Sequence, residues 1–156
     1  MQLNAHESAV NSVAFSPCRQ FIASGGFDRQ IFVWKLWEEG GEPFALAPKL
    51  VGSALKGHKN AILKVIWPKG EDSESENTLM FSCGAQRGNN LRGEILQWDL
   101  HKFERVRHYE GHKAIVNSID FCSGSTCSAS DDSSVKLWDA RMKHAAMSFE
   151  FEGVAQ

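Results

Sequence analysis

A repeated pattern of four residue types constrains the fold of this chain more than any other feature. A histidine is followed by a serine, an aspartate and a tryptophan at both ends of the sequence. In both copies the aspartate stands four positions after the serine and six before the tryptophan. Fixed internal spacing of this kind indicates a tandem structural repeat. The two copies are His6, Ser24, Asp28 and Trp34, and then His112, Ser128, Asp132 and Trp138.

A third, less regular copy lies between these two. It contains His58, Ser82 and Trp98, but the position six before its tryptophan is Arg92 instead of an aspartate. Three copies predict three structural units. We place the units at about residues 5–55, 57–109 and 111–150.

Each unit is built from short runs in which apolar and polar residues alternate. In the last unit these runs are residues 115–121, 127–130 and 135–138, with turn-forming residues at 123–125 and 131–133. Alternation at period two between turn residues is typical of half-buried strands. Outer strands at 49–55, 104–109 and 145–150 would complete each unit. We therefore expect an all-β chain of about twelve short antiparallel strands.

The units resemble WD repeats, which form the blades of one class of β-propeller. The resemblance is carried by Gly57-His58 and Gly111-His112 at the start of two units and by Trp98-Asp99 and Trp138-Asp139 at their ends. It implies a WD-repeat β-propeller with three four-stranded antiparallel blades. Propellers contain about four to eight blades. We therefore expect a partial propeller that is either part of a longer propeller or completed by a partner.

The repeated histidine, serine and aspartate are also the residue types of a nucleophilic catalytic triad. Neither Ser24 nor Ser128 lies in a Gly-x-Ser-x-Gly elbow, and catalytic sites are rarely repeated in tandem. A buried tryptophan N–H needs an acceptor, and a buried carboxylate needs donors. We therefore interpret the repeated residues as structural tetrads, which the resemblance also implies, and expect no enzyme activity.

Composition limits the classes of partner and ligand. The chain is 42% apolar and 23% charged with a net charge of −2, which favours neither nucleic acid nor membrane as a partner. The four cysteines are expected in or beside strands, which points to a reducing compartment and no disulfides. A zinc site of Cys122, Cys127, His108 and His112 is disfavoured because the two cysteines fall on different strands. We expect no metal and no cofactor.

Within the family, three segments resemble the WD-repeat proteins of the spliceosomal U5 small nuclear ribonucleoprotein. They are residues 23–29, 55–58 and 130–146. The resemblance implies a nuclear, non-catalytic scaffold in pre-mRNA splicing that contacts large spliceosomal protein subunits and does not read nucleic acid sequence. The alternative is a substrate receptor of a cullin-type ubiquitin ligase, because Trp138-Asp139-Ala140-Arg141 resembles a docking motif for its adaptor. Ser73, in an acidic segment with Glu76 three positions later, is a candidate phosphorylation site.

Strand order predicts which loops share an edge of the blades. Loops before the first strand and between the second and third strands share one edge, and the other loops share the opposite edge. Sorted in this way, the charged loop residues give one basic and one acidic edge, which suits docking between two partners of unlike charge. The basic edge would hold Lys56, His58, Lys59, Arg87, Arg92, His112 and Lys113, and the acidic edge Glu38, Glu39, Glu42, Glu71, Asp72, Glu74 and Glu76.

Overall fold

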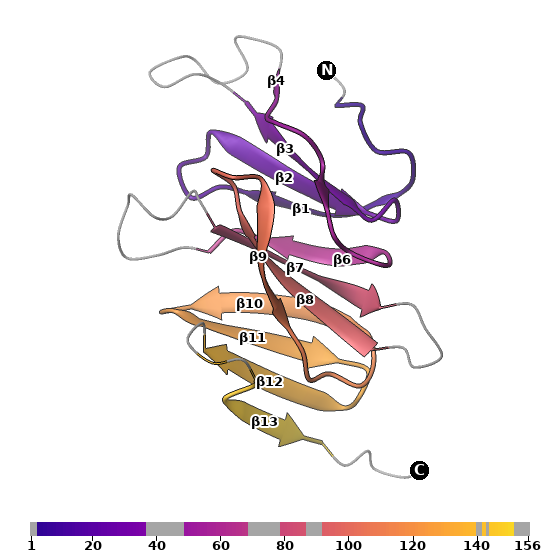
Figure 1. Cartoon of the computed structure of the whole chain (residues 1–156), viewed down its shortest axis with the longest axis vertical. Helices are drawn as coiled ribbons and strands as arrows, with labels where there is room; N and C mark the ends of the chain where they lie inside the picture. Colours follow the sequence, from indigo (N-terminus) through magenta and orange to yellow (C-terminus); the bar gives the residue numbers. More distant parts are fainter. Residues whose placement is uncertain are drawn as a thin grey trace.

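The computed structural model of the chain describes residues 3–36, 49–68, 79–86, 92–139, 142 and 144–151. These residues form thirteen strands in three antiparallel sheets, and none of them is helical. The described part of the chain therefore contains no helix that could span a membrane. Figure 1 shows the three sheets stacked along the long axis of the molecule in sequence order, with the N- and C-termini at opposite ends. The all-β prediction with three blades is confirmed.

The first sheet has the strand order β1-β2-β3-β4. Its strands are β1 (Val10–Phe15), β2 (Phe21–Gly26), β3 (Gln30–Lys35) and β4 (Lys49–Leu50), and β5 (Leu55–Lys56) also pairs with β3. The outer strand predicted over residues 49–55 is thus interrupted. Gly52 lies in the interruption with a φ of 64°, a conformation that strands do not adopt and that glycine tolerates.

The second and third sheets have four strands each in simple meander order. The second contains β6 (Ile62–Ile66), β7 (Leu79–Gln86), β8 (Arg92–Asp99) and β9 (Glu104–Tyr109). The third contains β10 (Val116–Cys122), β11 (Ser125–Ser130), β12 (Ser134–Asp139) and β13 (Met147–Glu150). The last strand starts two residues later than the predicted 145, and the other strands of this unit match the predicted runs within about two residues.

The same irregularity marks the first strand of every sheet. The register shifts between Val10 and Ser12 in β1, and it shifts at the corresponding positions of β6 and β10. A bulge at one fixed place in three strands increases the local twist in the same way each time. The three sheets are therefore copies of one unit in backbone detail as well as in sequence.

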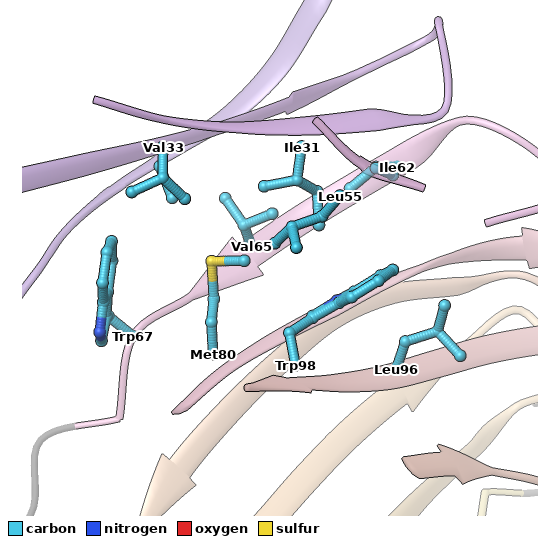
Figure 2. Close-up of a cluster of buried hydrophobic side chains, with 10 residues drawn as sticks. Ile31, Val33, Leu55, Ile62, Val65, Trp67, Met80, Leu96 and Trp98 are labelled. Carbon is cyan, nitrogen blue, oxygen red and sulfur yellow. The ribbon is translucent and has the colours of Figure 1, made fainter. Parts of the chain in front are cut away.

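The sheets are held together by two clusters of buried apolar side chains. One cluster lies between the first and second sheets, and Figure 2 shows Ile31 and Val33 of β3 pointing toward Val65 and Met80 of the second sheet. A Cβ atom added to Gly25 would lie 2.9 Å from Ile62 Cγ2, so a side chain there would push these sheets apart. The other cluster joins the second and third sheets. Its buried members are Phe81, Cys83, Ile95, Tyr109, Val116, Ile119 and Trp138.

The face of each sheet that carries the tryptophan points toward the preceding sheet. Trp98 belongs to the cluster shared with the first sheet, and Trp138 belongs to the cluster shared with the second. On the first sheet the corresponding face has no preceding sheet among the described residues, and Val13 and Phe15 are each 59% exposed there. None of Cys18, Cys83, Cys122 and Cys127 forms a disulfide.

Candidate functional site

The four residues of the third repeat form one continuous chain of hydrogen bonds. Trp138 Nε1 donates to Ser128 Oγ over 2.7 Å, and Ser128 Oγ lies 2.7 Å from His112 Nε2. His112 Nδ1 lies 2.9 Å from Asp132 Oδ2. The strand order explains why these residues meet. Strand β11 supplies the serine, β12 supplies the tryptophan, and the β11–β12 turn supplies the aspartate.

The aspartate of this set also ties the turn to the loop before the blade. Its carboxylate accepts hydrogen bonds from the backbone N–H groups of Lys113, over 2.8 Å, and Ser134, over 3.1 Å. Burial opposes the charged form of Asp132, but hydrogen bonds from Ser134, Lys113 and His112 hold the pKa of its carboxyl well below the usual range. Asp132 is therefore a carboxylate at neutral pH with several donors around it.

The first repeat has the same geometry. His6 lies 2.8 Å from Ser24 Oγ through Nε2 and 2.8 Å from Asp28 Oδ2 through Nδ1. Trp34 Nε1 donates to Ser24 Oγ over 3.4 Å. The backbone N–H of Glu7 donates to the same aspartate oxygen over 3.2 Å. The structure thus brings together all four sequence-selected residues in this blade and in the third.

In the second repeat a glutamate takes the place of the aspartate. His58 Nε2 lies 2.6 Å from Ser82 Oγ, to which Trp98 Nε1 donates over 2.7 Å. His58 Nδ1 lies 2.9 Å from Glu94 Oε2, which also accepts the backbone N–H of Lys59 over 3.2 Å. Glu94 was not among the residues selected from the sequence. The set is therefore complete in all three blades.

The position of Glu94 follows from the longer hairpin of this blade. Strand β8 begins at Arg92, so the position that holds a turn aspartate in the other blades is here part of a strand. Glu94 lies four residues before Trp98, two closer than the aspartates, and its additional methylene group restores the reach to the histidine. A carboxylate near the tryptophan in the one repeat without an aspartate was the sequence signal that could have found it.

Burial and charge distinguish these sets from catalytic triads. Each serine oxygen lies within hydrogen-bonding distance of a tryptophan N–H and a histidine nitrogen, and Ser82 and Ser128 are buried. Burial lowers the pKa of His112 and opposes the charged form of Glu94, although the hydrogen bond from His58 leaves the pKa of Glu94 lowered. The geometry satisfies buried polar groups, and the three serines of these sets, Ser24, Ser82 and Ser128, are all buried.

The structure describes part of the predicted basic edge. The backbone N–H groups of Lys59 and Lys113 are bound to the carboxylates of Glu94 and Asp132, so both lysines lie on the edge that carries the histidine loops. Lys56 and Arg92 are exposed at strand ends. Several predicted residues lie outside the described ranges: Arg87, Ser73, Ala140, Arg141 and every member of the acidic edge, namely Glu38, Glu39, Glu42, Glu71, Asp72, Glu74 and Glu76. Among the described residues no three histidine, cysteine or acidic side chains are grouped as metal ligands would be.

Comparison with known proteins follows the same division into blades. Residues 1–35 and 103–139 match the family described as "WD domain, G-beta repeat". The chain is 28% identical to Pre-mRNA-splicing factor cwf17 of Schizosaccharomyces pombe, over 96% of this chain and 39% of the relative. It is 30% identical to the U5 small nuclear ribonucleoprotein 40 kDa protein of Dictyostelium discoideum, over 96% of this chain and 37% of the relative.

Relatives with other names also match. Protein hir1 of S. pombe is 30% identical over 87% of this chain and 14% of the relative. The chain thus spans less than two-fifths of the length of these three relatives. The matched segments contain the first and third hydrogen-bonded sets, and the three sheets have the form of propeller blades. Sequence, sheet topology and the repeated sets therefore agree that the chain belongs to the WD-repeat family.

Proposed function

We propose that this chain is a non-catalytic scaffold for protein–protein interaction in the U5 particle of the pre-mRNA splicing machinery, and that it acts in the nucleus. The observation that carries the proposal is the match to two splicing proteins over 96% of the chain, including the irregular second blade. The relative hir1 matches over a smaller share, 87%. On this proposal, the partners of the present chain are large spliceosomal protein subunits.

The scaffold function depends on rigid blades. We propose that the three hydrogen-bonded sets are structural tetrads, because each one joins the loop before a blade to two of its strands. A fully satisfied buried network fixes the loop position and makes the blade edge a preformed surface. No substrate turnover is expected. A hydrolase activity that is lost in Ser128→Ala would contradict this part of the proposal.

The partner-binding residues proposed here lie on the loop edges. Lys56, Lys59, Arg92 and Lys113 supply positive charge on the edge that carries the histidine loops, and Arg87 is assigned to the same edge from strand order. Complementary charge steers association and orients the partners, and it contributes less to final affinity. We therefore expect a partner with an acidic surface on this edge.

A capture experiment tests the splicing assignment. The tagged chain is incubated with nuclear extract, and the retained proteins and RNA are identified. Enrichment of splicing proteins together with U5 RNA is the expected result. Enrichment of a cullin and its adaptor without U5 RNA would show the ligase receptor function instead.

A charge-matched control separates specific capture from general electrostatic attraction. Lys59→Glu with Lys113→Glu should reduce capture of one protein partner, because both lysines lie on the proposed docking edge. Lys102→Glu with Arg19→Glu makes the same change of charge at exposed positions in loops of the opposite edge and should leave capture of that partner unchanged. Equal loss in both double variants would contradict the proposed edge.

A further inference from the structure

An open groove of about 840 Å³ lies on the edge that carries the histidine loops. Residues that follow the histidine in each of the three blades contribute to it, together with the β2–β3 turn of the first blade. Its volume is in the range of ligand-binding sites in proteins. The lining residues that matter here are Glu7, Phe27, Arg29, Leu63 and Ile115.

Leu63 departs from its own repeat in a way that makes the groove apolar. The same position, five residues after the histidine, holds Asn11 in the first blade and Asn117 in the third. Both asparagines make hydrogen bonds through their side chains: Asn11 Nδ2 donates to the backbone oxygen of Ile62 over 2.8 Å, and Asn117 donates to Asp131. In the second blade a half-buried leucine side chain lines the groove instead.

Phe27 is a second departure of the same kind. It stands immediately before the tetrad aspartate, where the third blade has Asp131. Its backbone N–H donates to Ala9 O over 2.9 Å, and that of Asp131 donates to Ile115 O over 3.0 Å, so the two positions are structurally equivalent. The Phe27 side chain is nevertheless 56% exposed. A hydrogen-bonded turn thus holds an exposed aromatic ring at the groove.

Ile115 is the third departure. It stands three residues after the histidine, where the other blades have Ala9 and Ala61. Three positions, one in each blade, therefore carry a larger apolar residue than their equivalents, and all three line the same groove. Phe27 is exposed, and Leu63 and Ile115 are half-buried. Apolar side chains gathered at one groove in this way favour a binding site over ordinary surface.

The charges at the groove favour a negatively charged group beside an apolar one. Arg29 is exposed in the β2–β3 turn, and its guanidinium makes no ion pair among the described residues. The carboxylate of Asp28 is already occupied by His6 and by the backbone N–H groups of Glu7 and Gln30. The exposed Lys59 follows the next histidine, and Glu7 is the opposing charge.

We propose that this groove binds an extended segment of a partner protein in which an apolar side chain stands next to a carboxylate. The apolar side chain covers Phe27, Leu63 and Ile115, and the carboxylate binds Arg29. The proposal rests on the general function of the chain as a protein-binding scaffold and not on the splicing assignment. Aromatic anchors held in a preformed site are typical of the residues that dominate binding energy.

A random peptide library displayed on phage tests the proposal. Selection on the purified chain should enrich peptides that carry a leucine, isoleucine or aromatic residue beside aspartate or glutamate. The dissociation constant of an enriched, fluorescently labelled peptide is then measured with variants that exchange one blade's residue for that of another. Phe27→Asp and Leu63→Asn should each weaken binding about tenfold. Arg29→Ser should weaken it less, with an effect that decreases as salt rises.

A matched control variant accompanies these substitutions, and specific results would contradict the proposal. Arg19→Ser removes the same charge from the β1–β2 turn, where φ is 63° as against 66° at Arg29, and should leave peptide affinity unchanged. Unfolding midpoints show that each variant remains folded. Enrichment of basic peptides, or affinity unchanged in both Phe27→Asp and Leu63→Asn, would overturn the proposal. Peptide enrichment on the unchanged chain that is no greater than on a chain carrying both Phe27→Asp and Leu63→Asn would also overturn it. If the peptide experiment contradicts the groove proposal while the chain still captures splicing proteins, the proposed function stands.

Discussion

Glu94 Oε2 lies 2.9 Å from His58 Nδ1, and the two side chains are only 1% and 0% exposed. The equivalent carboxylates of the other blades, Asp28 and Asp132, come from turns and are slightly more exposed. The same histidine–carboxylate contact is therefore made by a strand residue in the second blade and by turn residues in the other two. The second blade keeps its tetrad although its hairpin is longer than those of its neighbours.

The first prediction concerns this substitute carboxylate. Glu94→Ala leaves a buried histidine nitrogen and the N–H of Lys59 without their acceptor, and should destabilise the chain by about 2–4 kcal/mol. Glu94→Asp shortens the side chain by one methylene group and should cost part of that amount. Urea unfolding measures both. Glu104→Ala, at an exposed glutamate of the same sheet, is the control. A change in Glu94→Ala no larger than in this control would show that Glu94 is dispensable.

The tetrads also show where sequence reasoning succeeds and where it ends. The positions of Ser24, Asp28 and Trp34 follow from spacing alone, because strand periodicity and a tight turn fix their relative places. Glu94 could not be assigned in the same way, because a carboxylate reaches a histidine by geometry and not by sequence position. The interruption of the first outer strand at Gly52 also depends on a packed neighbour, Phe103, which lies 51 residues later. The groove was missed because its lining comes from all three blades.

The second prediction separates the two roles of the tetrad tryptophan. Trp138 is buried and donates to Ser128, so Trp138→Ala removes both packing and a donor and should cost about 3–5 kcal/mol. Trp138→Phe retains most of the apolar volume and loses the N–H group, and should cost about 1–2 kcal/mol. Chemical denaturation followed by circular dichroism gives both values. Equal destabilisation by the two substitutions would mean that the hydrogen bond, and not the packing, dominates.

The third prediction is the dependence of stability on pH. The pKa of His112 is lowered in the folded chain by burial, so the unfolded chain binds more protons below about pH 6.5 and stability decreases there. The pKa of Asp132 is lowered despite its burial, by hydrogen bonds, so its contribution is present above about pH 4 and is lost as pH falls further. The free energy of unfolding should therefore decrease in two stages as the pH is lowered from 8 to below about 4.

The variant Asp132→Asn tests the assignment of the acid stage. It removes the carboxylate that titrates, so its stability should be lower than that of the unchanged chain at pH 7 and should vary less below about pH 4. Asp120→Asn, at an exposed position of β10, is the matched control. If the acid dependence is the same in Asp132→Asn and in the unchanged chain, other carboxylates account for it.

The fourth prediction follows from the uncovered apolar side chains on the first and third sheets. Val13 and Phe15 are exposed on one, and Met147 and Phe149 on the other. Apolar patches of this kind promote association, so the purified chain of 156 residues should sediment as a species larger than a monomer. Val13→Lys with Phe15→Lys should reduce the association, since both substitutions place charge on the patch. A monomer at micromolar concentration would contradict the prediction.

The last prediction concerns the two charged edges. Lys59 and Lys113 lie on one edge because their N–H groups bind the tetrad carboxylates, and strand order assigns Arg87 and Arg92 to the same edge. The acidic residues 71–76 are assigned to the opposite edge by strand order alone. Arg87→Glu with Arg92→Glu should therefore weaken capture of one partner, while neutralising Glu71, Asp72, Glu74 and Glu76 should weaken capture of a different one. Quantitative mass spectrometry of captured proteins distinguishes them. Complementary charge acts mainly on association rates, and dissolved salt screens exposed charges. Each effect should therefore decrease as salt is raised. Loss of the same partner to the same extent in both variants would mean that the charges do not define two separate docking edges.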